Sequence, residues 1–115
     1  MSFRFFLLQR VTALILVPLL MVHLIVIFYA TAKGLSAASI FARTRGSFGW
    51  GAFYTLFVLA AAIHGAIGVR SVVAEWAPST LKSDPRLLAT VLWVTGLGLT
   101  LLGLRAVYAV VLAWP

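Results

Sequence analysis

The stretch Leu59–Trp76, LAAAIHGAIGVRSVVAEW, decides the fold. It is almost wholly apolar, yet it holds His64 near its middle and Arg70 six residues later. It does not alternate apolar and polar residues as a half-buried strand would, so a helix is predicted. It belongs to a longer apolar run at about 50–74, which exceeds the roughly 20 residues that cross about 30 Å of hydrocarbon.

The whole chain has the composition of a membrane protein. Of its 115 residues, 63% are hydrophobic and 10% are charged, and the mean hydropathy is +1.13. A water-soluble protein of this size could not bury so much apolar surface. Two further apolar runs predict an all-α integral membrane protein, a single transmembrane domain over 1–115 with helices at about 11–32, 50–74 and 87–114. Three spans do not easily close a functional bundle, so we expect them to pack with a partner membrane subunit.

The charges fit the ends of membrane spans. The chain has nine Lys and Arg residues and only two Asp and Glu residues. The cations are scattered at the ends of the apolar runs, which argues against a nucleic-acid partner. The cations divide almost evenly between the two ends, and the aromatic residues gather near the 33–49 link as an interfacial belt. The cations of one end are Arg4, Arg10, Arg70, Lys82 and Arg86, those of the other are Lys33, Arg43, Arg45 and Arg105, and the belt residues are Tyr29, Trp50, Tyr54, Tyr108 and Trp114. We expect the bacterial cytoplasmic membrane, with the N-terminus in the cytoplasm.

His64 is the first candidate site residue, because polar residues inside membrane helices are rare and commonly functional. Its neighbours on the same helix face are the small residues Ala60, Gly68 and Ser71. A groove of small residues admits a neighbouring helix or a flat macrocycle, and haem iron takes imidazole as an axial ligand. Arg70, about 9 Å further along, could meet a haem propionate. An interhelical hydrogen bond from His64 beside a snorkelling Arg70 explains the same residues, so both interpretations stay open.

His23 is the second histidine, twelve residues into the first predicted span and five after Pro18. It shares a helix face with Thr12, and its large neighbours offer no groove of small residues. A metal ligand and a structural hydrogen bond are both open for it. Counted from the span ends, His23 and His64 lie about 18 and 15 Å deep, and two stacked haems would want a larger offset unless the helices are tilted or displaced.

Two motifs resemble a known family. The segment HGAIGVRSVVAEW resembles the H-x3-G-x-R pattern, followed by an acidic residue, of the cytochrome b membrane-anchor subunit of succinate dehydrogenase and its fumarate reductase relatives. The start LLQRVTALIL is similar to that family's H-R-x-[ST]-G opening, with Gln9 and Ala13 in place of the histidine and the glycine. Phe6 stands where the family usually has serine, which leaves Thr12 or Gln9 to supply that polar contact.

The resemblance implies a haem b and a quinone, ubiquinone or menaquinone, as substrate. His64 would be one axial ligand, and a second small membrane anchor subunit would supply the other. Arg10 would lie by the quinone, and Arg70 near a propionate or the quinone. His23 is similar to a first-span histidine of two-haem members, so one haem or two are implied. The expected cofactor-binding residues are His64, Arg70, Arg10, Gly68, Ser71 and His23, with His64 and His23 as iron ligands.

The implied function is electron transfer to quinone in the tricarboxylic acid cycle and the respiratory chain. A flavoprotein subunit and an iron–sulfur subunit would pass electrons from succinate to this anchor. One alternative is a b-type cytochrome subunit of a formate, hydrogen or nitrate oxidoreductase, which commonly needs more spans and histidines. The other is a small homo-oligomeric channel or exporter, and the absence of a carboxylate within a span counts against it.

Overall fold

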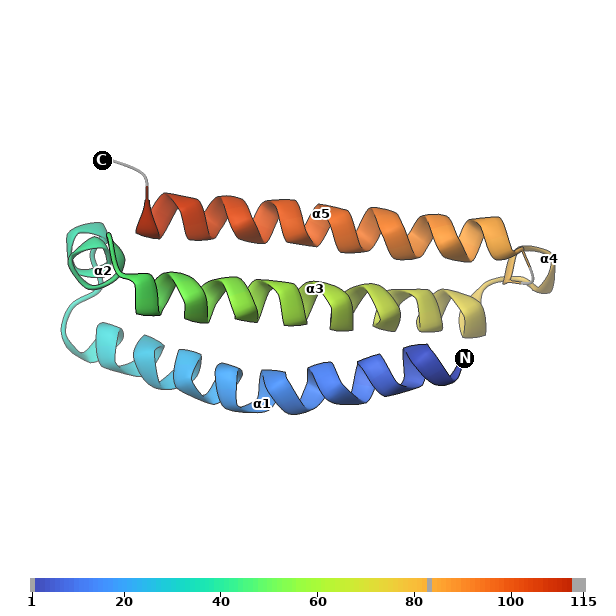
Figure 1. Ribbon diagram of the computed structural model, residues 1–115, viewed down its shortest axis with the longest axis horizontal. Coiled ribbons are helices and arrows are strands. Elements are labelled where there is room, and N and C mark those ends of the chain that lie inside the picture. Colours follow the sequence, from blue (N-terminus) through green and yellow to red (C-terminus); the bar gives the residue numbers. More distant parts are fainter. Residues whose placement is uncertain (1, 83, 113–115) are drawn as a thin grey trace.

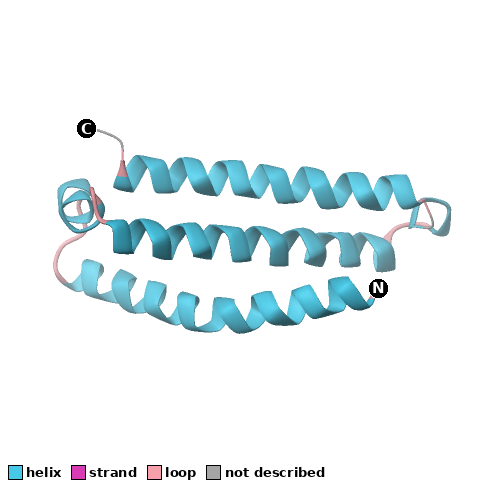
Figure 2. Cartoon of the chain, in the orientation of Figure 1, coloured by secondary structure: helices cyan, strands magenta, loops and turns pink. Residues whose placement is uncertain are grey.

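The computed structural model describes residues 2–82 and 84–112 and contains five helices in that part of the chain. They are α1 (Phe3–Ala32), α2 (Ala37–Thr44), α3 (Phe48–Trp76), α4 (Ser79–Lys82) and α5 (Pro85–Val111). The three long helices lie side by side in one layer with α3 in the middle, and only helices and loops are present (Figures 1 and 2). Their 30, 29 and 27 residues are long and apolar enough to cross a membrane. The predicted all-α fold with three spans is confirmed.

Capping side chains extend the helices beyond the predicted apolar runs. The side chain of Ser2 accepts a hydrogen bond from the backbone N–H of Phe5 at 3.3 Å, so α1 begins at Phe3 rather than at Val11. Asp84 caps α5 through the N–H of Arg86 at 2.9 Å, with Pro85 in the first helical position. Helix α5 ends at Val111, and the predicted end at Trp114 lies outside the described residues.

Small residues bring α3 and α5 close together. A Cβ added at Gly96 would lie 3.4 Å from the Cβ of Ala66, and one at Gly103 would collide with Val58. Close backbone approach over glycine and alanine is how membrane helices gain packing without a hydrophobic driving force. Four of the residues buried within the chain, Ala60, Ala62, Ala66 and Ile67, belong to α3. The centre of packing therefore runs along α3.

Helix α1 packs antiparallel to α3 on the other side. Thr12 contacts His64, and His23 contacts Tyr54. Moving eleven residues toward the C-terminus of α1 therefore corresponds to moving ten residues toward the N-terminus of α3, as in an antiparallel pair. Pro18 lies between the two contacts. It has no N–H for the carbonyl one turn before it, and α1 bows in Figure 1 where α3 and α5 run straighter.

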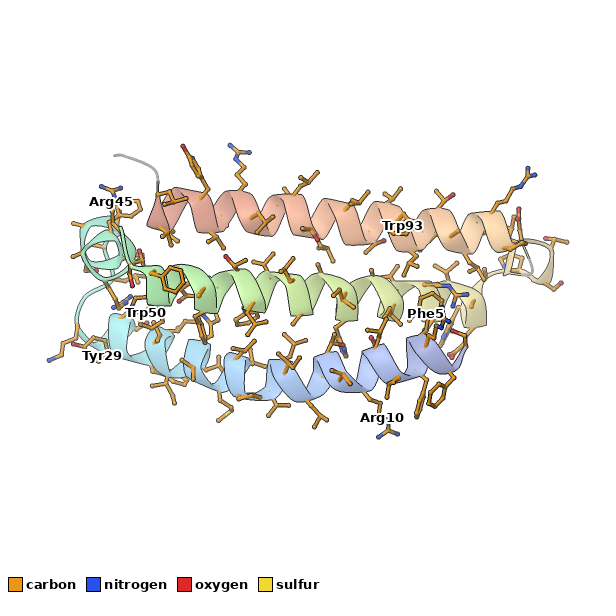
Figure 3. The ribbon with its side chains drawn as sticks, in the orientation of Figure 1. Phe5, Arg10, Tyr29, Arg45, Trp50 and Trp93 are labelled. Atoms are coloured by element: carbon orange, nitrogen blue, oxygen red, sulfur yellow. The ribbon has the colours of Figure 1, made fainter. Side chains whose placement is uncertain are left out.

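The 33–49 link is folded against the end of α5. Ser36 and Ser39 form a capping box that begins α2. Thr44 Oγ1 lies 2.7 Å from the carbonyl oxygen of Val110, and the N–H of Gly46 donates to the carbonyl of Val111 at 2.8 Å. Gly46 has φ +70°, a left-handed conformation that favours glycine after a helix. Tyr29 and Trp50, two residues of the predicted aromatic belt, lie at this end of the layer together with Arg45 (Figure 3).

Candidate functional site

His64 is joined to α1 by one hydrogen bond. Its Nδ1 lies 3.2 Å from Oγ1 of Thr12, a residue with 4% of its surface exposed. Its Nε2 makes no hydrogen bond within the described residues and is not among their buried, unpartnered atoms. The interhelical bond that the sequence left as one alternative is therefore present, and it engages one ring nitrogen while the other stays accessible.

The groove of small residues around His64 is filled by α1. A Cβ added at Gly68 would lie 3.5 Å from Nε2 of Gln9, and Ala60 is buried. The hydroxyl of Ser71 donates to the carbonyl of Ile67 on its own helix at 2.9 Å. Of the two occupants expected for this groove, the structure shows the neighbouring helix. A larger ligand of His64 would therefore approach from outside this helix contact.

Gln9 carries an unsatisfied group in the same contact. Its Oε1 is buried and has no hydrogen-bond partner in the described part of the chain. Thr12, the other residue expected to replace the family's serine, already contacts Leu8, Gln9 and His64. Of the two expected substitutes, Gln9 is the one with an unused hydrogen-bonding atom.

Arg70 lies beside an open groove at the end of the layer where α1 begins. Its Cζ sits 4.6 Å from the centre of the Phe5 ring, a cation–π contact between α3 and α1. The groove has a volume of about 700 Å³ and also reaches Trp93 of α5. Its other lining side chains are almost all apolar, so Arg70 is its one charged group among the described residues. Phe5 and Trp93 both lie toward this end of the layer (Figure 3).

Arg10 lies on a different face of the molecule. It is exposed, its Cζ is 5.0 Å from the centre of the Phe6 ring, and its side chain points away from α3 (Figure 3). Two residues along a helix turn the side chain by about 200°, so Arg10 and Thr12 occupy nearly opposite faces of α1. The structure does not bring Arg10 together with His64 and Arg70.

His23 lies further from His64 than the sequence predicts. Its ring makes edge contacts with Tyr54 and Phe57 at centroid distances of 5.8 and 5.3 Å. These residues precede His64 by seven to ten positions, or about 10 to 15 Å along α3. The predicted offset of about 3 Å is wrong because α1 begins at Phe3, eight residues before the predicted start.

The surroundings of His23 also differ from those of His64. Its Nδ1 is buried without a hydrogen-bond partner in the described residues. The ring lines a cavity of about 450 Å³ together with Arg43, Thr44 and Tyr54. The two histidines thus occupy separate places, and no group of three or more His, Cys, Asp or Glu among the described residues could hold a metal ion.

The comparison with protein families decides the kind of protein. A family described as the succinate dehydrogenase/fumarate reductase transmembrane subunit matches residues 3–102. The chain belongs to this family. It is therefore a multi-pass membrane subunit of a succinate dehydrogenase or fumarate reductase complex, an oxidoreductase that comprises further subunits. Searches of curated proteins and of solved structures found no match.

Thr12 is the residue of this membrane subunit that sequence reasoning undervalued. Its position on the face of His23 is correct, but the antiparallel register pairs it with His64. The sequence offered only a hydroxyl in the first span as a signal, because the predicted spans place Thr12 one residue from the end of its span and His64 ten residues from the end of its own. The sequence alone does not say how two neighbouring spans are rotated or shifted against each other.

Proposed function

We propose that this membrane subunit holds one haem b through Nε2 of His64 and helps to form the site where a quinone is reduced. The observation that carries the proposal is an accessible imidazole nitrogen on a membrane helix of this family. A haem with two imidazole ligands supplies one-electron transfer between the iron–sulfur subunit and the quinone. His64 would supply one of these imidazoles, and a second small membrane anchor subunit the other.

The two histidines differ in how well they suit an iron. A histidine bound to a metal almost always donates its other ring N–H to an oxygen acceptor. His64 has such an acceptor in Thr12 at 3.2 Å, whereas the Nδ1 of His23 is buried without one in the described residues. His64 therefore fits the role of ligand and His23 does not, which favours one haem. Because α1 fills the groove beside His64, the macrocycle would lie toward the face that the partner subunit covers.

The groove beside Arg70 suits the quinone. Its volume of about 700 Å³ lies within the range of small-molecule sites, and apolar walls with one cation match an apolar molecule that carries carbonyl acceptors. The N–H groups of Arg70 would donate to a quinone oxygen, and such charge-assisted hydrogen bonds gain strength away from water. Arg10, exposed on the outer face of α1, would contact the partner subunit instead.

In this proposal the complex sits in the bacterial cytoplasmic membrane with the start of α1 facing the cytoplasm. The iron–sulfur and flavoprotein subunits would dock at that end, where Arg70 and its groove lie. Electrons from succinate would then reach His64 and the quinone over a short path. The subunit anchors the complex and shapes the quinone site, and the dicarboxylate chemistry belongs to the flavoprotein.

The haem assignment is tested by the optical spectrum of the purified complex. We expect a low-spin b-type spectrum after dithionite reduction, with the haem lost in His64→Ala. His23→Phe keeps an aromatic ring against Tyr54 and Phe57 and should retain the wild-type haem content. A correctly assembled but colourless wild-type complex would overturn the haem proposal. Loss of haem in His23→Phe with an intact complex would overturn the assignment of a single haem to His64.

A further inference from the structure

We propose that Thr12 determines which ring nitrogen of His64 is free to bind the iron. The inference rests on the proposed haem function, because it concerns the nitrogen through which that function would act. Thr12 touches neither iron nor quinone in this scheme. It is a positioning residue that acts through the ring of His64.

The hydroxyl of Thr12 has a single proton to donate. A hydroxyl offers one donor and two acceptor lone pairs. The Oγ1 of Thr12 lies 2.7 Å from the carbonyl oxygen of Leu8 and 3.1 Å from that of Gln9. Carbonyl oxygens only accept, and 2.7 Å is the usual length of an O–H···O bond, so the distances favour donation of the hydroxyl proton to Leu8.

The direction of the bond to His64 follows. With its proton directed to Leu8, Oγ1 can only accept from the imidazole nitrogen 3.2 Å away. Nδ1 of His64 therefore carries the ring proton, and Nε2 carries the lone pair that a metal requires. The opposite tautomer would place an N–H at Nε2, which has no hydrogen-bond partner in the described chain. An unpaired N–H in hydrocarbon is costly, so the surroundings also disfavour that tautomer.

The hydrogen bond fixes the ring as well as the proton. Thr12 is 4% exposed and is tied to its own helix through Leu8, so its oxygen is a rigid acceptor. Donation from Nδ1–H raises the basicity of Nε2 and limits rotation of the ring. Stronger donation to iron favours the oxidised state, so loss of this bond should make the haem midpoint potential more positive.

The first experiment compares Thr12→Val and Thr12→Ser in the assembled complex. Valine keeps the shape of threonine but cannot accept a hydrogen bond, and serine keeps the hydroxyl. We expect Thr12→Val to bind haem about tenfold more weakly and to show a more positive midpoint potential, and Thr12→Ser to restore both. Thr44→Val is the matched control, because Thr44 is also a buried threonine whose hydroxyl lies 3.0 Å from the carbonyl oxygen one turn back, that of Ile40, and its helix α2 lies at the opposite end of the layer from the groove beside Arg70. Its haem potential should equal that of the wild type.

The second experiment reads the tautomer without any haem. In the full chain in lipid bilayers, His23→Phe leaves His64 as the only histidine. Nitrogen-15 NMR should then show a protonated Nδ1 and an unprotonated Nε2, with a mixture of tautomers once Thr12→Val is added. A protonated Nε2 in the presence of Thr12 would overturn the inference even if Thr12→Val failed to fold.

The outcomes separate this inference from the haem proposal. If the wild-type complex contains no haem, the proposed function is wrong. The NMR measurement still decides whether Thr12 sets the tautomer of His64. If the Thr12→Val complex binds haem with the affinity and the midpoint potential of the wild type, the proposed role of Thr12 is wrong and the haem proposal is unaffected.

Discussion

At the scale of single residues, the two membrane histidines differ in their local contacts. Both are partly buried in the contact between α1 and α3. Nδ1 of His64 meets a hydroxyl, whereas the ring of His23 meets the faces and edges of Tyr54 and Phe57. A polar partner orients one nitrogen and leaves the other available, while aromatic neighbours mainly hold the ring by packing. The same residue type thus has different surroundings at two positions along the helices.

The two arginines near the start of α1 allow a sharp prediction about the quinone. Arg70→Leu removes the only cation of the groove among the described residues, and a charge-assisted hydrogen bond contributes about 1.5–3 kcal/mol. We expect quinone reduction to fall roughly tenfold or more. Arg10→Leu changes an exposed residue on the opposite side of α1 and should cause a much smaller loss.

Two rates are measured for each variant complex: succinate-dependent reduction of quinone, and oxidation of succinate with an artificial dye as electron acceptor. Both variants should retain dye reduction, since neither residue belongs to the soluble subunits. A larger loss in Arg10→Leu than in Arg70→Leu would move the quinone to the outer face of α1. Loss of dye reduction in step with quinone reduction would show damage to assembly instead.

The candidate residues of the site can be named from the sequence, but their pairings with one another cannot. A histidine within an apolar run marks a functional candidate because the bilayer penalises polar groups. Helical periodicity also places Thr12 and His23 on one face. The partner of Thr12 depends on the register of two helices, which is set by contacts such as Gln9 against Gly68. No local pattern in either helix encodes that register.

At the scale of helices, the contact between α3 and α5 depends on glycine. Gly103→Ala would drive a methyl group into Val58, a short and stiff side chain, so the two helices must separate. Overpacking of this kind typically costs about 1–3 kcal/mol. Gly98→Ala is the matched control, because a Cβ there meets nothing within 4 Å. Both changes gain the same helix propensity, about 1 kcal/mol, so their difference isolates the clash.

Thermal unfolding of the complex in detergent measures this difference. We expect Gly103→Ala to lower the midpoint and Gly98→Ala to leave it equal or slightly raised. Equal midpoints for the two variants would mean that α3 and α5 are not held at the close distance seen here.

Helix boundaries show what hydropathy does and does not report. The apolar run from Val11 marks the part of α1 suited to hydrocarbon, but the helix continues back to Phe3 through Gln9 and Arg10. Polar residues and a capping serine extend a helix without extending its apolar run. Because the first helix was predicted to begin at Val11, the distance of His23 from the start of the helix was underestimated. The separation between His23 and His64 was underestimated for the same reason.

At the scale of the whole molecule, the three spans form an open layer. In the most apolar 18-residue segment of each long helix, the share of residues buried within the chain is 22% for α3, 6% for α1 and zero for α5. The described residues include no large side chain that is fully buried. Such an open layer is consistent with one subunit of a larger complex.

Isolation of the tagged chain in mild detergent tests this association. We expect a flavoprotein, an iron–sulfur protein and a second small membrane protein to co-purify in equal amounts. Production of the chain without these partners should greatly reduce its steady-state level. A stable, colourless homo-oligomer from the chain alone would instead support the channel or exporter alternative.

The open layer also bears on the fate of surplus copies. A newly inserted chain that meets no partner leaves the exposed side chain of Arg10 and an imidazole nitrogen of His64 uncovered by protein. Polar groups exposed in a bilayer mark a membrane protein as unassembled, and unassembled proteins are subject to degradation. We therefore expect orphan copies to be short-lived, so that the supply of this chain is matched to that of its neighbours by turnover.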